Sequence, residues 1–117
     1  MSESILDSIK PLVGIQPADT AFDSSLIVHI NSVFMILHQL GVGTDTVFAI
    51  TGNTETWDLF LLSGDEAYLS LTKSYLAAKV QTMFDPPTSG IVANALERNI
   101  QEMESRLVTQ DEIRPAV

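Results

Sequence analysis

The two histidines are the only side chains in this sequence whose ordinary pKa lies near neutrality, so they are the first candidates for a general base or a metal ligand. His29 and His38 are nine residues apart on one expected helix. A helix turns by roughly 100° per residue, which places the two rings on opposite sides of it. They therefore cannot bind one metal ion within a single chain. A valine, not a second ligand, follows each histidine at a spacing of four, and both are interpreted as ordinary helix residues.

The carboxylates are the second group that could carry out chemistry. Fifteen acidic residues allow close pairs, for example Asp58 with Glu55 or Glu102 with Glu104, but acid–base catalysis needs carboxyl groups that converge in a pocket. The sequence has no calcium-loop pattern, no glycine-rich phosphate loop and no Gly-x-Ser-x-Gly nucleophile motif. We therefore predict that the protein is not an enzyme and has no cofactor and no bound metal. A small hydrolase is the least favoured alternative.

The charge of the chain is strongly acidic and unevenly distributed. The 117 residues contain six lysines and arginines, fifteen acids and no cysteine, with a net charge of -9. Such a surface repels phosphate backbones, which argues against nucleic-acid binding as the main function. Residues 1–65 contain eight acids and a single base, Lys10. Within them, residues 45–65 carry four acids and no base. This stretch is either a solvated loop or a wall that must not adhere to a polyanion.

The length of the chain predicts one domain with one hydrophobic core. The lack of cysteine excludes disulfides and thiolate zinc sites. No apolar run approaches the roughly 20 residues that span a bilayer, and the first ten residues lack the basic start of a secretion signal. We expect a protein that is cytosolic at synthesis and has no membrane partner.

Hydrophobic periodicity predicts an all-α fold, a small bundle of four to five helices. A short irregular or β segment is expected at 44–54, where glycines surround a β-branched patch. The chain is expected to form a single domain over residues 1–107, followed by an extended, flexible tail at 108–117. The expected helices span residues 4–12, 24–40, 55–62, 66–84 and 90–108.

The second expected helix carries apolar residues on two sides. One broad stripe from Leu26 to Leu40 faces the expected core, while Val28 and Met35 share a second face. In a chain of this size, a helix covered on both sides has either a central position or a contact with another subunit. Asp23 is expected to cap the start of this helix.

Several segments, taken in their order along the chain, resemble a known protein family. They are the helix at 23–34 with the Leu-Gly-Val-Gly sequence that comes after it, the tryptophan segment 56–61, and the Asp-Pro-Pro turn at 84–89 followed by a helix that ends at 100–107. Together they resemble the small head-tail connector, or adaptor, proteins of tailed bacteriophages and prophages. The resemblance covers nearly the whole chain. The residues that carry it most clearly are Trp57, Asp85, Pro86 and Pro87.

The resemblance implies a structural virion protein. Members of this family are mostly helical subunits that assemble into a ring, commonly of twelve or thirteen copies, beneath the portal at the DNA-packaging vertex. The ring offers a platform for the next neck or tail-completion protein. The genome passes through its channel during packaging and ejection without specific binding. The resemblance thus places the protein in the virion neck, and in the host cytoplasm during assembly.

The resemblance also implies roles for particular residues. The apolar pair Val28 and Met35 would suit lateral contacts between subunits. Acids that face the channel, here Asp45, Glu55 and Asp58, would let DNA slide without adhering. By analogy with related adaptors, the C-terminal end would contact the portal. On this hypothesis the contacting residues are Val108, Thr109, Ile113, Arg114 and Pro115.

A second function also suits the charge. A small acidic phage regulator or DNA mimic would occupy a basic site on a host or phage nucleic-acid-binding protein. Such mimics need a dense stripe of carboxylates, whereas fifteen acids are here spread over 117 residues. Strong, salt-dependent binding to a DNA-binding protein would favour this alternative.

Overall fold

Five helices make up the part of the chain that the computed structural model describes, which is residues 3–44, 46–61 and 66–113. The prediction of a small all-α bundle is confirmed, and the described residues contain no β-strand. The helices are α1 (Ile5–Leu12), α2 (Asp23–Gln39), α3 (Trp57–Phe60), α4 (Glu66–Phe84) and α5 (Gly90–Ile113).

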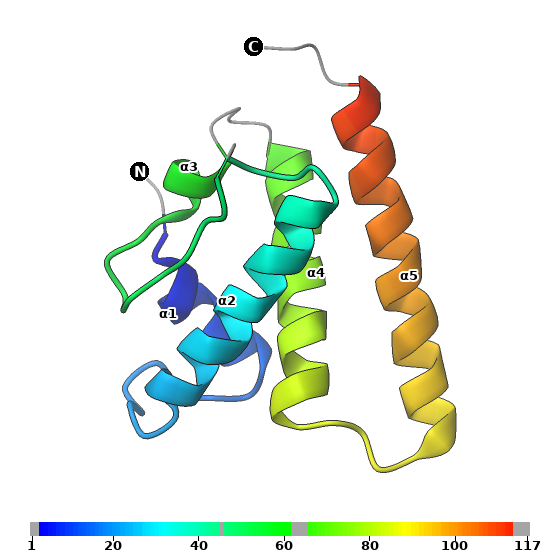
Figure 1. Ribbon diagram of the computed structural model, residues 1–117. Helices are drawn as coiled ribbons and strands as arrows, with labels where there is room; N and C mark the ends of the chain where they lie inside the picture. Colours follow the sequence, from blue (N-terminus) through cyan, green and yellow to red (C-terminus); the bar gives the residue numbers. More distant parts are fainter. Residues whose placement is uncertain (1–2, 45, 62–65, 114–117) are drawn as a thin grey trace.

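The central helix of the bundle is α4. It packs against α1 and α2 and also against α5, which runs antiparallel alongside it (Figure 1). Because α4 is covered from both directions, its buried residues are spread around the helix. They are Tyr68, Thr72, Tyr75, Leu76, Ala77 and Val80.

Helix α1 begins and ends where the sequence predicts. The Ser4 hydroxyl accepts a hydrogen bond from the backbone N–H of Asp7 at 3.3 Å, which caps the first turn. Gly14, with a φ of 85°, stands just after the last turn. The backbone of this N-terminal segment also pairs with the chain before α3, since the Ile5 N–H donates to the Glu55 carbonyl at 3.0 Å. This hydrogen bond joins the start of α1 to the chain just before α3.

Helix α2 starts one residue earlier than expected, and Asp23 does not cap it. Asp23 is the first residue of the helix, and Phe22 occupies the cap position without a side-chain hydrogen bond. The Asp23 carboxylate instead forms an ion pair with Lys10. The Phe22 ring packs edge-on against Phe84 of α4, with ring centroids 5.4 Å apart. Two tertiary contacts thus fix the start of α2 in place of a local cap.

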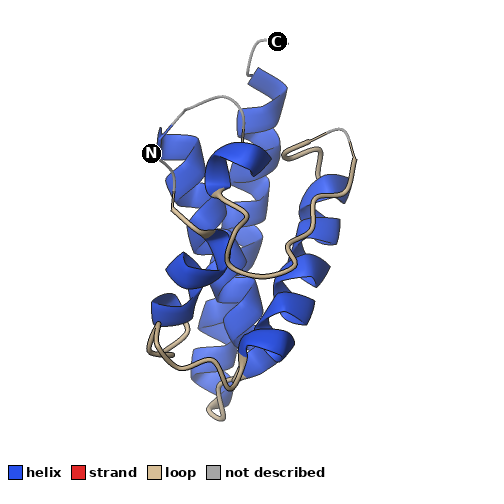
Figure 2. Cartoon of the chain, turned by 90° about the vertical axis from the view of Figure 1, so that its left-hand side faces the viewer, coloured by secondary structure: helices blue, strands red, loops and turns tan. Residues whose placement is uncertain are grey.

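The segment between α2 and α3 is irregular, and its β-branched patch forms no strand (Figure 2). Asn31 of α2 holds it through two hydrogen bonds to Ile50: its side-chain amide donates to the Ile50 carbonyl at 3.0 Å, and its Oδ1 accepts from the Ile50 N–H at 2.8 Å. The helix that follows is also shorter than the predicted 55–62. It begins after Thr56 and ends at Phe60.

Gly43 offers a sharp test of packing between this loop and α3. Its φ is 99°, and a Cβ at this position would overlap the buried ring of Phe60. Gly14 has a similar φ of 85° but open space around it. We expect Gly14→Ala to lower the free energy of unfolding by about 1 kcal/mol through backbone strain alone. Gly43→Ala should lower the free energy of unfolding clearly more in the same urea titration. Equal losses for the two variants would show that the Phe60 ring moves aside at no cost in stability.

Helix α4 has the predicted bounds, whereas α5 is longer than predicted by about one turn. The expected extended tail from 108 is therefore wrong as far as Ile113, and residues 114–117 lie outside the described residues. The physical reason lies in the sequence. Residues 109–113 contain no proline or glycine, and the first residue that cannot continue a helix is Pro115. Leu107, fully buried, holds the last turns of α5 on the bundle.

Candidate functional site

The predicted chemistry-bearing residues do not converge on one site. His29 is half-buried with its ring 6.4 Å from that of Phe84, and His38 is half-buried further along α2. Across the described ranges, no three histidine or carboxylate side chains lie close enough together to hold a metal ion. The candidate site of this protein is therefore its surface, and the question is which faces are built for contact.

The predicted channel acids have different surroundings. The Glu55 carboxylate is tied to its own loop, because its Oε2 accepts from the Thr51 N–H at 3.0 Å and from the Thr51 hydroxyl at 2.8 Å. Asp58 is exposed and accepts a hydrogen bond from the Thr56 hydroxyl. Asp45 lies outside the described residues. Glu55 therefore has a structural role that the sequence pattern did not indicate.

Glu55 also predicts a pH dependence of stability. The hydrogen bond from the Thr51 hydroxyl, aided by backbone N–H groups, lowers the pKa of Glu55 below its ordinary 4.5. A carboxyl with a lowered folded-state pKa stabilises the fold above pH 4.5, and the contribution is lost as the pH falls through the lowered value. We expect the stability advantage of the wild type over Glu55→Gln to shrink in urea titrations below that pH. A constant difference down to about pH 3 would contradict this origin.

The second apolar face of α2 is open in the single chain. Val28 is 63% exposed and Met35 is 46% exposed, while the opposite side of the helix is buried on the bundle. The expectation that α2 is covered on both sides is therefore not met within one chain. Any cover over Val28 and Met35 must therefore come from outside the chain.

The seam between α4 and α5 holds the main polar cluster of the bundle. The Tyr75 hydroxyl donates to Glu104 Oε2 at 2.6 Å, and Lys79 Nζ lies 4.0 Å from the same oxygen. Burial, together with the nearby Glu104 carboxylate, raises the pKa of Tyr75, so the phenol stays protonated and keeps donating. This cluster ties α5 to α4 near the middle of both helices.

Pro86 and Pro87, two of the family-motif residues, lie at the end of this seam. They help to line a cavity of about 410 Å³ between α4 and α5, together with Leu96 and Ile100. The Asp85 N–H still donates to the Gln81 carbonyl at 2.9 Å, so the helix ends directly before the two prolines. The motif thus sets the reversal from α4 into α5.

Trp57, the fourth motif residue, belongs to the core. It is 1% exposed, and its indole N–H donates to the Ser8 hydroxyl of α1 at 2.8 Å. Lys73 of α4 places its ammonium 5.7 Å from the centroid of the indole ring. Trp57 therefore joins α1, α3 and α4 within the core.

The predicted portal-contacting residues lie at the far end of α5. Val108 is half-buried, Thr109 is exposed, and Ile113 is the last residue of the helix. Arg114 and Pro115 lie outside the described residues. This end of α5 extends past the neighbouring ends of α2 and α4 (Figure 1).

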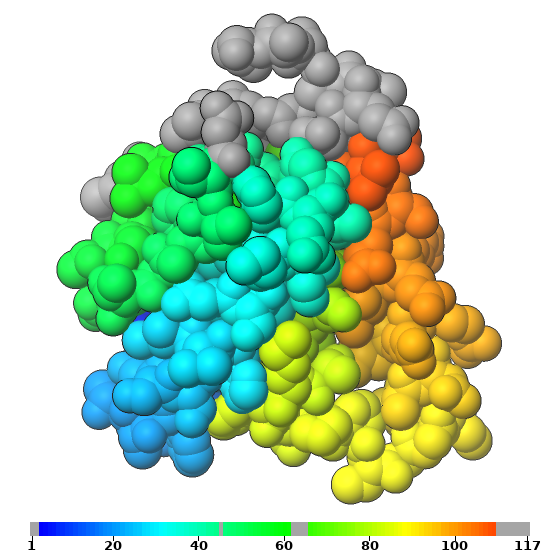
Figure 3. Space-filling view, viewed as in Figure 1, coloured from blue at the N-terminus to red at the C-terminus, as the bar shows by residue number. Residues whose placement is uncertain are grey.

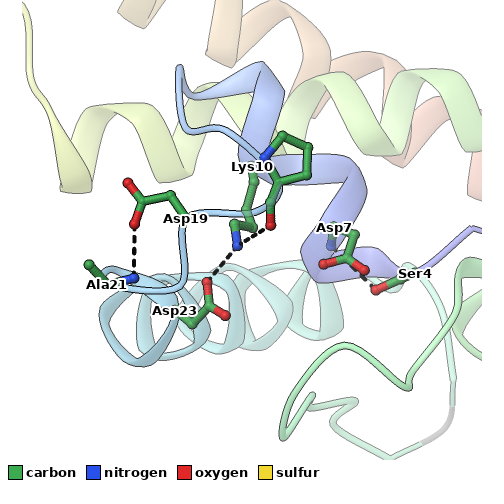
Figure 4. Close-up of polar contacts among 7 residues, drawn as sticks. Ser4, Asp7, Lys10, Asp19, Ala21 and Asp23 are labelled. Atoms are coloured by element: carbon green, nitrogen blue, oxygen red, sulfur yellow. Dashed lines mark hydrogen bonds and ion pairs between the residues drawn. The ribbon is translucent and has the colours of Figure 1, made fainter.

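Lys10 is a buried charged residue whose burial the sequence pattern did not indicate. Its side chain is only 1% exposed, and its Nζ lies 2.9 Å from Asp23 Oδ1 and donates to the Pro17 carbonyl at 3.0 Å (Figure 4). Asp19, beside it, caps a local turn by accepting from the Ala21 N–H at 3.0 Å. In the sequence, the one feature that marks Lys10 is that it is the single base among the first 65 residues. The structure gives it a structural role, locking α1 to the start of α2.

With this geometry described, comparison with known proteins decides the family. The family described as "Phage connector protein" matches residues 5–114 of the chain. The chain belongs to the phage connector family. The resemblance inferred from the tryptophan segment and the Asp-Pro-Pro turn is therefore confirmed, and the match includes the end of α5. No curated protein and no solved structure matches this phage connector.

Family membership fits a structural role better than a catalytic one. Phage connectors join parts of the phage particle, so this connector is a structural protein that associates with other head or tail proteins in the virion. In the described part of the chain, no helix is both long enough and apolar enough to cross a bilayer.

Proposed function

We propose that this chain is the subunit of a ring that joins the phage head to the tail. About a dozen copies would dock beneath the portal, extend the DNA channel and offer a platform for the next neck or tail-completion protein. The observation that carries the proposal is the family match over residues 5–114. The open apolar face on α2 supports a role in assembly.

The end of α5 is the proposed portal contact. It combines the half-buried Val108 and the exposed Thr109 with Ile113, followed by Arg114 and Pro115 in the sequence. Its position past the ends of α2 and α4 supports access to a partner without rearrangement of the core (Figure 1). A helix end that extends past its neighbours offers its last backbone carbonyls to a partner.

The acids of the α3 region are the proposed channel wall. Asp58 is exposed, and Asp45 belongs to the same base-free stretch of sequence. Glu55 contributes its negative charge there although Thr51 binds its carboxylate. A wall of this sign gains no affinity from counterion release, so DNA slides past it. Particles with both Asp45→Lys and Asp58→Lys should retain DNA and eject it more slowly. Unchanged packaging and ejection would contradict the channel assignment.

Incubation with the purified portal tests docking. Native mass spectrometry of the full chain with its portal should reveal one portal ring carrying many copies of the connector. Thr109→Asp should weaken this complex, whereas Ser74→Asp, on the exposed side of α4, should leave it intact. A stable two-fold dimer that does not bind the portal would contradict the proposal.

A further inference from the structure

The outer face of α2 is exposed yet carries no charge. Residues 24–44 include no aspartate, glutamate, lysine or arginine, although a helix that faces water normally carries charged side chains on that side. We call this surface the α2 face. Its exposed residues are Ser24, Ser25, Val28, Ser32, Met35 and Gln39.

The loop beside α2 extends this uncharged surface. Residues 46–54 also contain no charged side chain, and the two hydrogen bonds between Asn31 and Ile50 hold the loop along the helix. Val47, 41% exposed, adds apolar area to it. Between Ser24 and Thr54 the sequence has one charged residue, Asp45. In a chain with 21 charged residues, residues 24–44 and 46–54 stand out because they contain none.

A second uncharged surface lies at the start of α5. Residues 86–96 carry no charged side chain, whereas Glu97 and Arg98 follow directly. Ile91 is 83% exposed and Val92 is 54% exposed, among the most open apolar side chains of the described chain. We call residues 86–96 the α5 start. Ile91 and Val92 therefore form an exposed apolar patch at the beginning of α5, whereas the later turns of this helix carry charged side chains.

The two surfaces cannot meet within one chain. Both α2 and α5 pack on α4, which lies between them (Figure 1). In the space-filling view, α2 is light blue to cyan and the α5 start is yellow at the lower right, in different parts of the surface (Figure 3). Two different patches on one chain are what a head-to-tail contact between identical subunits requires, whereas a two-fold contact uses one patch twice.

A second copy of the chain is the occupant that the charge distribution favours. Each copy has a net charge of -9, so two copies repel wherever their carboxylates come together. Neither the α2 face nor the α5 start contains a carboxylate, so a contact centred on these two surfaces avoids that repulsion. Interface centres are depleted of charge, as the α2 face is. A partner with a basic surface would find no carboxylate there to compensate the loss of its hydration.

We propose that the α2 face of one copy packs on the α5 start of the next, with Val28 and Met35 against Ile91 and Val92. The inference rests on the proposed function, since a ring of identical subunits needs one repeated head-to-tail contact. It adds which two faces form that contact. Met35 suits such a junction because its flexible thioether fills irregular gaps between side chains.

Cysteine cross-linking tests this pairing directly, because the natural chain contains no cysteine. Particles would be produced with Val28→Cys, with Ile91→Cys, or with both in one chain, and treated with a short bifunctional thiol reagent. The double variant should give a ladder of covalent dimers, trimers and larger species. Each single variant should stay monomeric on a denaturing gel. Particles assembled from both single variants together should give a dimer and nothing larger.

Other outcomes separate the pairing from the function. The control is Ser74→Cys with Ile91→Cys, since Ser74 is exposed on α4 outside both faces, and it should give no ladder. Dimers from Val28→Cys alone would overturn the head-to-tail pairing in favour of a two-fold contact. Cross-links only to a different virion protein, or no ladder in particles that contain the chain, would also overturn it while leaving the connector function standing. Absence of the chain from the particles would contradict the proposed function itself.

Discussion

Replacing Trp57 by alanine is expected to lower the free energy of unfolding by about 3–5 kcal/mol. The indole is 1% exposed, and its removal leaves a cavity where α1, α3 and α4 meet. The Ser8 hydroxyl loses its donor, and Lys73 loses the ring 5.7 Å from its ammonium. Small domains are stable by about 5–15 kcal/mol, so the variant should unfold at a much lower urea concentration.

A matched control lies on the same short helix. Leu59 is 52% exposed, and Leu59→Ala should change stability by less than about 0.5 kcal/mol. Trp57→Phe keeps most of the buried ring but loses the hydrogen bond to Ser8. Its loss of stability should therefore fall between those of Trp57→Ala and Leu59→Ala. Equal losses for Trp57→Ala and Leu59→Ala would show that α3 does not anchor the N-terminal helix to the bundle.

Breaking the ion pair between Lys10 and Asp23 is the second large effect. Lys10→Met leaves the Asp23 carboxylate and the Pro17 carbonyl without their donor in the junction between α1 and α2. Removing one partner of a fully buried pair typically costs about 3 kcal/mol or more. Lys10 is 1% exposed but Asp23 is 28% exposed, so the carboxylate left behind stays partly hydrated and we expect a loss of about 2–3 kcal/mol. Urea unfolding followed by circular dichroism measures the loss.

The combined variant distinguishes the pair from simple packing. Lys10→Met with Asp23→Leu removes both charges, and most of the stability lost in Lys10→Met should return. The pair between Arg106 and Glu102 provides the surface control, since both side chains are well exposed. Arg106→Ala should cost less than about 0.5 kcal/mol. If Lys10→Met costs no more than Arg106→Ala, the buried pair contributes little to the fold.

Local sequence signals predicted most of the helices. The periodicity of α1 and α4 and the Asp-Pro-Pro stop all act within one or two turns, and the structure has these boundaries where they were expected. The start of α2 was predicted less well. Asp23 has the chemistry of a cap, but Lys10 of α1 competes for its carboxylate, and that contact depends on how two helices meet.

The irregular region and the surfaces were the parts that sequence predicted least. The β-branched patch at 47–51 favours a strand, but the described residues contain no second strand to pair with it, and Asn31 binds the loop instead. Val92 fits the apolar stripe of α5 and is nevertheless 54% exposed, because α4 covers only the later turns of that stripe. Periodicity marks an apolar face, and only the fold reveals whether the chain itself covers it.

The family was recognisable from the order of three short segments, while the contact surfaces were not. Val28 and Met35 stood out in the sequence as a second apolar face. The α5 start became visible only from the exposure of Ile91 and Val92. Its lack of charge is a sequence feature, but its meaning depends on the side chains being open.

Electron cryo-microscopy of the neck of the phage particle tests the central claim most directly. We expect a ring between portal and tail in which α2, α4 and α5 of each subunit are arranged as in the single chain and the end of α5 contacts the portal. Adjacent subunits should meet through the α2 face and the α5 start. A complete neck whose density leaves no place for this chain would contradict the claim that it is the head-tail connector.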